Sequence, residues 1–449
     1  MQKSLNVAVA GAGLVGTLLA IYLKKIGHHV QVFDKNEDIR QIEFSGKSIN
    51  LAISTRGWKT LDDIGIGDRI RALAIPMDKR AIHNIDGSIT HQKYGMHGES
   101  IYSISRGGLN QVMVDIAEEF GVEFKFEHKI WDVNLAKPSL FIGESERGDW
   151  EELAFDKIFG ADGSFSKIRA RMQKQNRFNY SQYFLPLGYK ELRIPANEDG
   201  SHKIDKNSFH IWPHGDFMLI ALPNEDGSFT CTLFMPFEGE ISFENINTEE
   251  KLVKFFAEFF PDTKTLIPKL KTDYFKNPTS SLVTTDCYPW TYEDKVALLG
   301  DAAHAMVPFY GQGMNAGFED ITEMYNQIVK NGDDWLAVFE NYQNIRKPNG
   351  DAISELSFRN FIEMGTKTAD KMFLLQKKIE AKFTNLYPKR WLPLYDRVTF
   401  SLRPYTEALA IGDQQREVMN EIMAIPDIEN IWDTDEIMEK MYQLTEIKN

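Results

Sequence analysis

The sequence predicts an α/β protein: a parallel-sheet domain opens the chain, an antiparallel sheet is inserted into it, and the C-terminal region is helical. Three observations carry this prediction. Short apolar runs and a helical pattern alternate over residues 5–34; aromatic and β-branched runs broken by tight turns occupy 209–234; and long charged amphipathic segments fill most of the chain after 315.

The first 34 residues predict a βαβ unit. Residues 5–10 (LNVAVA) and 29–34 (HVQVFD) have the apolar, Val-containing character of buried strands, and 14–25 has helical spacing. Residues 209–212, 217–222 and 228–234 are separated by PHGD and PNEDG, which favour tight turns and therefore an antiparallel sheet.

Gly11, Gly13 and Gly16 form a GxGxxG motif between the first strand and the first helix. In a Rossmann-type domain the first glycine permits a tight turn, the second lets a pyrophosphate approach the backbone, and the third lets helix and strand pack closely. The motif therefore predicts dinucleotide binding at the helix N-terminus. A purely structural glycine turn is the alternative.

Asp34 ends the second strand, 23 residues after Gly11, where a carboxylate can hydrogen-bond a ribose hydroxyl. An acidic residue there repels a 2′-phosphate, so NADP is disfavoured as the bound dinucleotide and NAD or FAD remains. The alternative is an aspartate that only terminates the strand.

Two later segments also end an apolar strand with glycine and aspartate. They are 159–169 (FGADGSFSKIR), which contains Asp162, and 297–317 (ALLGDAAHAMVPFYGQGMNAG), which contains Asp301. Asp301 is placed to hold a sugar or ribityl hydroxyl, and a helix that begins near Gln312 would direct its positive end at an anion or an electron-rich ring. Each segment alone is also compatible with an ordinary turn between strand and helix.

Composition excludes several classes of protein. Fifty-one basic against 65 acidic residues give a net charge of −14, which argues against nucleic-acid binding. Cys231 and Cys287 have no metal-ligand spacing, so we expect neither a disulfide framework nor a metal site. No run of 18 apolar residues and no signal peptide are visible, which predicts a cytoplasmic protein.

Taken in their order along the chain, GAGLVG, GADGSFSKIR and GDAAHAMVPFYGQGMNAG resemble the signature set of the single-component FAD-dependent aromatic hydroxylases. The resemblance implies bound FAD, NADPH as a visiting co-substrate and O₂. Arg106, in SISRGGLNQ, matches an arginine near the FAD. The cofactor-binding residues carried over by position are Gly11, Gly13, Val15, Gly16, Asp34, Arg106, Asp162, Asp301, Gly313, Met314 and Asn315.

Further stretches, among them 75–83, 92–95, 177–192 and 398–405, resemble the members of this family that act on L-kynurenine. This resemblance covers residues 6 to 405 and implies hydroxylation at the ring 3-position, to 3-hydroxykynurenine, through a flavin C4a-hydroperoxide. The nearest alternative is a hydroxylase of the same fold that acts on another anionic aromatic substrate. A flavoprotein that serves as a redox sensor or binding partner is an alternative of a different class.

The same resemblance implies a substrate site. A carboxylate buried beside a flavin needs a forked cation and neutral donors. Phe309 and Tyr310 are expected to form a catalytic wall over the aromatic ring, although core packing would also explain them. The residues that match substrate-contacting positions are Arg80, expected on the carboxylate, Tyr94, Asn360 and Tyr405.

Domain boundaries and two departures complete these expectations. His214 follows FHIWP where many relatives carry arginine, so a charged contact there should be absent or depend on pH. The segment 427–449 does not resemble the membrane anchor of eukaryotic relatives, so we expect a protein that is not anchored to a membrane. The expected domains are an FAD-binding domain (1–75, 100–178 and 288–350), a substrate domain (76–99 and 179–287) and a helical C-terminal region (351–449).

Overall fold

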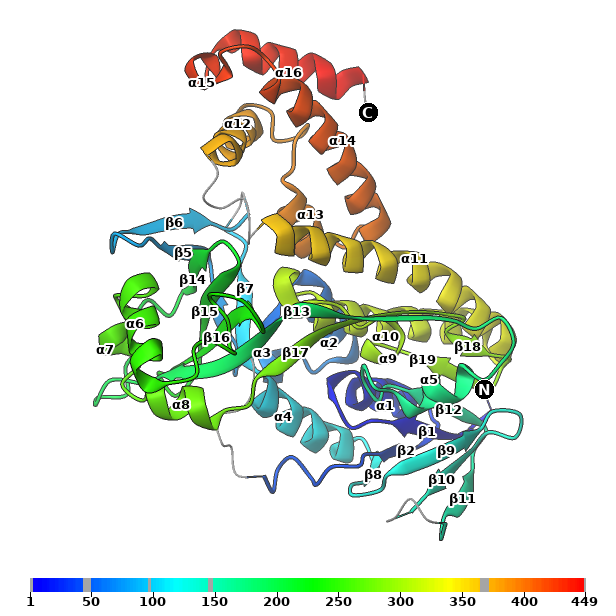
Figure 1. Ribbon diagram of the computed structural model, residues 1–449. Helices are drawn as coiled ribbons and strands as arrows, with labels where there is room; N and C mark the ends of the chain where they lie inside the picture. Colours follow the sequence, from blue (N-terminus) through cyan, green and yellow to red (C-terminus); the bar gives the residue numbers. More distant parts are fainter. Residues whose placement is uncertain (1–2, 43–49, 96–97, 144–147, 364–370, 448–449) are drawn as a thin grey trace.

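The computed structural model describes residues 3–42, 50–95, 98–143, 148–363 and 371–447. Each of the three expected domains includes some residues that lie outside these ranges. Figure 1 shows a broad α/β body with a helical extension that rises from it and carries the C-terminus.

The first sheet is the parallel sheet predicted from the start of the chain. Its six strands are β1 (Asn6–Ala10), β2 (His29–Phe33), β8 (Glu123–Lys125), β12 (Lys157–Gly160), β18 (Thr291–Tyr292) and β19 (Val296–Leu298). They are arranged in the order β18-β19-β12-β1-β2-β8, and all neighbours are parallel except β18 and β19. Strand β1 is central and apolar because packed elements cover both of its faces.

Helices follow the strands of this sheet and pack onto it. They are α1 (Leu14–Lys25), α4 (Arg106–Glu119), α5 (Lys167–Met172), α9 (Asp301–His304) and α10 (Gly313–Asn331). Helix α1 lies between α4 and α10. The first turns of α1 and α10 lie close together, since a Cβ at Gly317 would lie 2.7 Å from Val15 Cγ2.

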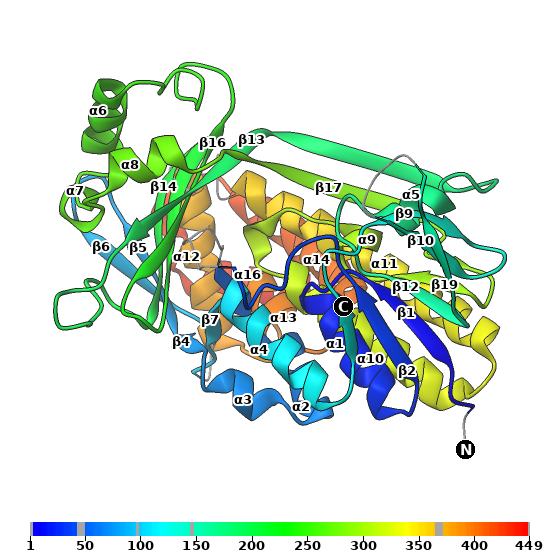
Figure 2. The same ribbon diagram turned by 90° about the horizontal axis from the view of Figure 1, so that it is seen from below.

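A second sheet forms the other half of the body, and a group of short helices covers one of its faces (Figure 2). Its strands are β5 (Lys79–His83), β6 (Ile89–Lys93), β13 (Asn179–Ile194), β14 (Ser208–His214), β15 (Phe217–Pro223), β16 (Phe229–Pro236) and β17 (Ser280–Tyr288). The covering helices are α6 (Glu249–Phe259), α7 (Thr263–Leu266) and α8 (Leu270–Lys276).

The order β17-β13-β16-β15-β14-β5-β6 departs in one respect from the antiparallel sheet that we expected: β5 and β14 are parallel. The hairpin β5–β6 comes from an earlier part of the chain, so no tight turn connects β5 to β14 and sets their relative direction. The remaining pairs are antiparallel, and the turns at 213–216 and 223–227 predict two of them, β14–β15 and β15–β16.

Strands β13 and β17 form a long two-stranded ribbon that passes from the second sheet over α9 (Figures 1 and 2). Their pairing runs from Tyr189 opposite Ser280 to Asn179 opposite Tyr288, with one irregularity near Phe184. Thr285 of β17 donates its backbone N–H to the carbonyl of Ala305, at 2.8 Å, directly after α9. The ribbon thus joins both halves of the body.

Two small sheets and a pair of helices, none of them predicted, complete the body. One sheet has the order β3-β7-β4 and the other the order β11-β10-β9. The elements are β3 (Asn50–Ile53), β4 (Ile75–Met77), β7 (Ile101–Ser105), β9 (Ile130–Asn134), β10 (Ser139–Ile142), β11 (Glu151–Ala154), α2 (Thr55–Ile64) and α3 (Gly67–Arg71).

The C-terminal part is helical, as predicted, and the extension has a hydrophobic core of its own around Phe383, Trp391 and Met441. Among the described residues, no helix is both long and apolar enough to cross a bilayer. The fold class expected from the sequence is confirmed, whereas the domain boundaries stay a prediction. The helices are α11 (Trp335–Ile362), α12 (Lys371–Leu386), α13 (Leu394–Thr399), α14 (Tyr405–Met423), α15 (Ile428–Ile431) and α16 (Asp435–Ile447).

Candidate active site

The GxGxxG loop has the shape that a dinucleotide requires. Gly11 has a φ of +101°, and a Cβ at Gly16 would lie 2.0 Å from the carbonyl oxygen of Gly11, so both positions need glycine. A Cβ at Gly13 would meet none of the described atoms within 4 Å. The N-terminus of α1 therefore opens onto free space at Gly13, where a pyrophosphate can approach the backbone.

Asp34 and Val15 tie this loop to its surroundings. The Asp34 carboxylate accepts a hydrogen bond from the backbone N–H of Ala12 at 2.8 Å, which places it beside the loop. Val15 packs against the third motif, since a Cβ at Gly317 would lie 2.7 Å from Val15 Cγ2. Arg106 is exposed at the first residue of α4.

The second motif holds a half-buried carboxylate, one of whose oxygens has no hydrogen-bond partner among the described residues. Asp162 Oδ2 accepts the backbone N–H of Lys167 at 2.6 Å, while its buried Oδ1 has no partner among the described residues. Burial raises the pKa of Asp162. Arg169 donates to the carbonyl of Ala302 at 2.8 Å, so the second and third motifs are in direct contact.

The third motif presents the N-terminus of α10. Asn315 is fully buried and accepts the backbone N–H of Ser54 at 3.0 Å while it donates to the carbonyl of Ala52 at 2.9 Å. Gly313 is open, since Met306 at 3.9 Å is the nearest described atom to a Cβ placed there. Asp301 is exposed on the first turn of α9, and Met314 is partly buried.

Arg80, on β5, lies in a box of aromatic rings. Its Nε donates to the hydroxyl of Tyr94 at 3.3 Å, and its guanidinium lies 4.3 Å from the ring centre of Tyr395, on α13. The ring of Tyr395 stacks at 5.5 Å on Tyr94 and at 5.6 Å on Tyr310. In the described part of the chain, no carboxylate forms an ion pair with Arg80. The box therefore offers a forked cation to an anionic ligand.

Two carboxylic acids, Asp396 and Glu99, affect the electrostatics of this box. Burial, with Glu99 adding to it and Arg80 opposing it, raises the pKa of Asp396 to about 6. Asp396 therefore carries its full charge only above that pH. Burial also raises the pKa of Tyr94 and of Tyr310 well above the ordinary tyrosine value, so both hydroxyls stay neutral.

An apolar wall adjoins the box. Phe309 and Tyr310 belong to a short 3₁₀ turn (Pro308–Tyr310), and Asn360 of α11 donates to the carbonyl of Phe309 at 2.8 Å. The ring of Phe309 packs at 5.2 Å on Phe234 and at 4.7 Å on Phe361. The structure thus brings together five of the six predicted catalytic and substrate-binding residues, Arg80, Tyr94, Phe309, Tyr310 and Asn360.

The sixth, Tyr405, has a different set of contacts. Its buried hydroxyl donates to Gln312 Oε1 at 3.1 Å, and the guanidinium of Arg56 lies 3.9 Å from its ring centre. The third tyrosine around Arg80 is Tyr395, which the sequence reasoning missed. The stretch compared with the family began at 398, three residues after Tyr395, so only the packing of α13 reveals it.

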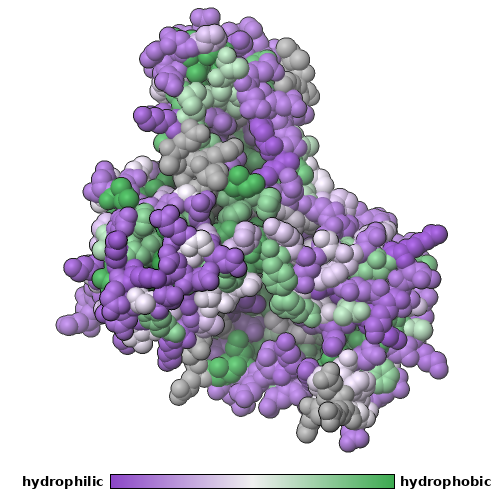
Figure 3. All heavy atoms as spheres, in the orientation of Figure 1, coloured by the Kyte–Doolittle hydropathy of each residue, from purple (hydrophilic) through white to green (hydrophobic). Residues whose placement is uncertain are grey.

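An open cavity and a half-buried histidine complete the surroundings. Figure 3 shows a largely hydrophilic face with apolar side chains gathered near its middle. A cavity of about 630 Å³ is lined by Leu187, Phe237 and Phe361, and Phe361 is also the ring that stacks on Phe309. His214 packs on Phe217 and Phe260, and burial lowers its pKa, so it is neutral at pH 7.

Comparison with known proteins gives consistent similarities. A family model described as "FAD binding domain" matches residues 4–357. The chain is 64% identical over 444 residues, 99% of both chains, to a protein of Flavobacterium johnsoniae named kynurenine 3-monooxygenase. It is 42% identical to a Dictyostelium discoideum protein of the same name, over 95% of this chain and 94% of that one.

Solved structures share the fold at low sequence identity. 2-Methyl-3-hydroxypyridine-5-carboxylic acid oxygenase superposes with a TM-score of 0.67 and 20% identity, over 83% of this chain and 96% of that one. P. aeruginosa PqsL, solved with 2-aminobenzoylacetate, gives a TM-score of 0.65 and 17% identity, over 81% and 97% of the two chains.

Proposed function

The chain belongs to the kynurenine 3-monooxygenase family of FAD-binding monooxygenases, and from this premise we propose that it hydroxylates L-kynurenine at ring position 3. One atom of O₂ enters the ring, the other leaves as water, and NADPH supplies two electrons. The observation that carries the substrate assignment is Arg80, a guanidinium in an aromatic box beside an apolar wall.

The residues of the three motifs fit FAD. We propose that the loop receives the pyrophosphate at Gly13, where it is open, while Gly11 and Gly16 give the tight turn and the close packing that shape it, and that Asp34 binds the ribose. The orphaned Oδ1 of Asp162 and the exposed Asp301 are polar groups available to the cofactor. When bound, FAD supplies the oxygen-transfer chemistry.

The protein's own part is to bind, orient and shield the substrate. Arg80 pairs with the α-carboxylate of L-kynurenine, and Tyr94 donates beside it. We propose Tyr395 for the role that the sequence suggested for Tyr405, because Tyr395 is the ring that contacts Arg80. A substrate held at this end places its aromatic ring toward the apolar wall.

Phe309 and Tyr310 form the surface against which that ring packs. Asn360 fixes the wall through its bond to the carbonyl of Phe309, which makes it a positioning residue as well as a candidate substrate contact. An apolar wall excludes water, and water in the site would favour release of hydrogen peroxide over transfer of oxygen to the ring.

The test of the function is NADPH oxidation in air by the purified enzyme, with and without L-kynurenine. Stimulated oxidation and a product heavier by about 16 Da are expected, because one oxygen atom is added. Benzoate and anthranilate serve as comparison substrates. Bound flavin without stimulation by L-kynurenine, but with stimulation by another aromatic acid, would keep the fold assignment and reject the substrate.

Gly13→Ala is expected to lower FAD content by about tenfold or more, since a methyl group would occupy the space that a pyrophosphate needs. Gly13 has a φ of −74°, so alanine is not strained there, and its Cβ meets no described atom within 4 Å. The FAD-free variant should therefore have the melting temperature of the FAD-free wild-type protein. Flavin absorbance per protein and thermal unfolding check both expectations; wild-type FAD content in the variant would contradict the cradle.

A further inference from the structure

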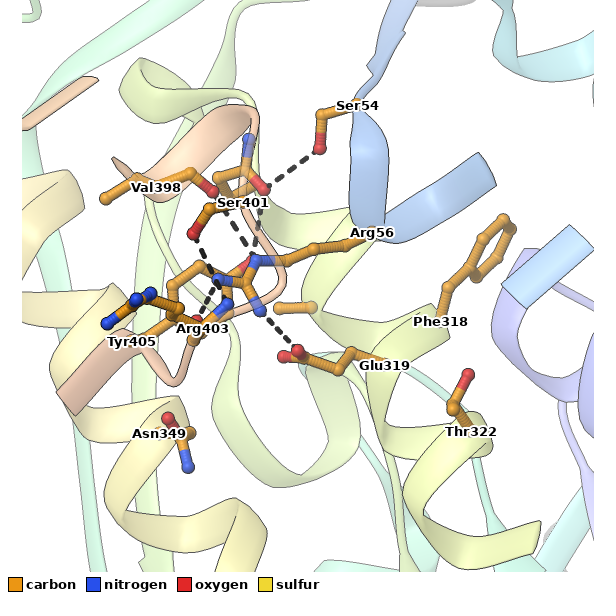
Figure 4. Close-up of polar contacts among 12 residues, drawn as sticks. Ser54, Arg56, Phe318, Glu319, Thr322, Asn349, Val398, Ser401, Arg403 and Tyr405 are labelled. Carbon is orange, nitrogen blue, oxygen red and sulfur yellow. Dashed lines mark hydrogen bonds and ion pairs between the residues drawn. The ribbon is translucent and has the colours of Figure 1, made fainter. Parts of the chain in front are cut away.

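Arg56, on α2, is a buried arginine whose side chain donates hydrogen bonds to two backbone carbonyls. Its side chain is 0% exposed. Nε donates to the carbonyl of Val398 at 3.4 Å, one Nη group donates to the carbonyl of Arg403, and the other pairs with Glu319 of α10 (Figure 4). The face of the guanidinium lies 3.9 Å from the ring centre of Tyr405. Each of the three guanidinium nitrogens therefore has a polar partner, and one face of the group packs on an aromatic ring.

These contacts hold both ends of the turn between α13 and α14. Val398 is in α13, and Arg403 lies two residues before the start of α14. Tyr395 lies three residues before Val398 on the same short helix, so the two share one side of α13. Arg56 therefore fixes the helix that carries the tyrosine stacked on Arg80.

The same arginine is tied to the N-terminal end of α10. Glu319, its partner, also accepts from Arg346 at 2.6 Å, so its position is set independently of Arg56. Tyr405 donates to Gln312, the residue that precedes α10, and Ser54 donates its backbone N–H to Asn315. Arg56 thus stands between the helix end that faces the cofactor site and the helix that bears Tyr395.

We propose that Arg56 is a positioning residue for substrate hydroxylation: it sets the distance between Tyr395 and the N-terminus of α10, and thereby how far the bound ring lies from the flavin. The inference rests on the function proposed above. Arg56 itself touches neither substrate nor cofactor. A displacement of about 1 Å at such a distance from the chemistry costs about 100-fold in rate.

The experiment compares Arg56→Met, which keeps an unbranched apolar stem and removes the donors, with Arg56→Lys, which keeps the charge. Arg71→Met is the control, because Arg71 also packs on α2, through Trp58, but is 42% exposed and pairs with Asp62. The readouts are FAD content, the Kd of L-kynurenine from its effect on flavin absorbance, KM, kcat, and the fraction of NADPH oxidation that yields hydroxylated product.

For Arg56→Met we expect wild-type FAD content, a KM and Kd for L-kynurenine raised by about tenfold or more, and a coupled fraction that falls severalfold. Arg56→Lys should lie between the wild type and Arg56→Met. Hydrogen exchange of the amides in 394–405, measured with FAD bound and after its removal, should be faster in both variants. Arg71→Met should match the wild type in all of these.

A purely structural arginine would lower the melting temperature and leave KM, Kd and coupling unchanged, and that result would overturn the proposal. Loss of FAD in both Arg56 variants would also overturn it, since the role would then be cofactor retention. If Arg56→Met does not fold, wild-type KM and coupling in Arg56→Lys are decisive against it. If L-kynurenine does not stimulate NADPH oxidation by the wild-type enzyme, the proposed function is rejected instead. Hydrogen exchange of the amides in 394–405 still reports in that case whether Arg56 holds the turn.

Discussion

Arg80→Met is expected to raise the KM for L-kynurenine by at least about 30-fold, because truncating one partner of a buried charge pair costs about 2–5 kcal/mol and 1.4 kcal/mol is a factor of ten. FAD content should not change, since Arg80 lies on β5, away from the GxGxxG loop. NADPH oxidation that continues should form more hydrogen peroxide per product, because the ring is no longer held at its wall. Steady-state kinetics with a peroxide assay measures both effects.

Arg193→Met is the matched control for Arg80→Met. Arg193 lies on the same sheet, in β13, but its side chain is 51% exposed and its ion pair with Asp226 is at the surface. Arg80→Lys should recover only part of the affinity, since an ammonium lacks the planar fork that binds a carboxylate with two bonds. Equal KM and coupling in Arg80→Met and wild type would refute the carboxylate assignment.

Asp320→Ala is expected to destabilise the protein by about 3–5 kcal/mol, the cost of breaking a buried ion pair by removal of one partner. Asp320 is fully buried on α10; its carboxylate binds Arg346 Nε at 2.8 Å, His304 Nε2 at 2.6 Å and the backbone N–H of Gly300 at 2.9 Å. Truncation removes one of the two carboxylates that pair with Arg346 and frees the turn that carries the third motif. The measurement is the temperature at which unfolding releases the flavin, followed as a rise in flavin fluorescence.

The charge of Asp320 also gives this effect a pH dependence. Burial opposes ionisation, but His304 and Arg346 outweigh it and hold the pKa of Asp320 below its ordinary value. A lowered folded-state pKa means that this stabilisation is present above the unfolded pKa and is lost as pH falls through the folded pKa.

The control for Asp320→Ala is Lys330→Ala, on the exposed side of α10, which should change stability by less than about 0.5 kcal/mol. A release temperature for Asp320→Ala equal to that of the control would contradict the argument.

The elements predicted well from the sequence are those whose signals are local. β1, α1 and β2 follow from adjacent apolar runs and glycines, and α1 has the predicted bounds, Leu14–Lys25. The parallel pair β5–β14 and the small sheet β3-β7-β4 join strands that are distant along the chain. Short runs of this kind carry no local mark of their partner, so periodicity alone does not assign it.

The candidate site divides in the same way. Asp34 and Asp162 stand at strand ends and are tied to the backbone near their motifs, as their position in the sequence suggests. Tyr395 is 301 residues from Tyr94, on which it stacks, and it becomes visible only when α13 is placed. The sequence indicated Tyr405 instead, but the guanidinium that packs on the Tyr405 ring is that of Arg56, and the Tyr405 hydroxyl donates to Gln312.

The ribbon of β13 and β17 has a consequence for how the protein comes apart. Domains joined by flexible linkers separate and melt one by one. Here a hydrogen-bonded ladder runs from the second sheet to the edge of α9, so neither half can lose its order without exposing backbone groups of the other. We therefore expect the body to unfold as a single cooperative unit, and a cut anywhere between β1 and β19 would divide the strands of the first sheet between two fragments.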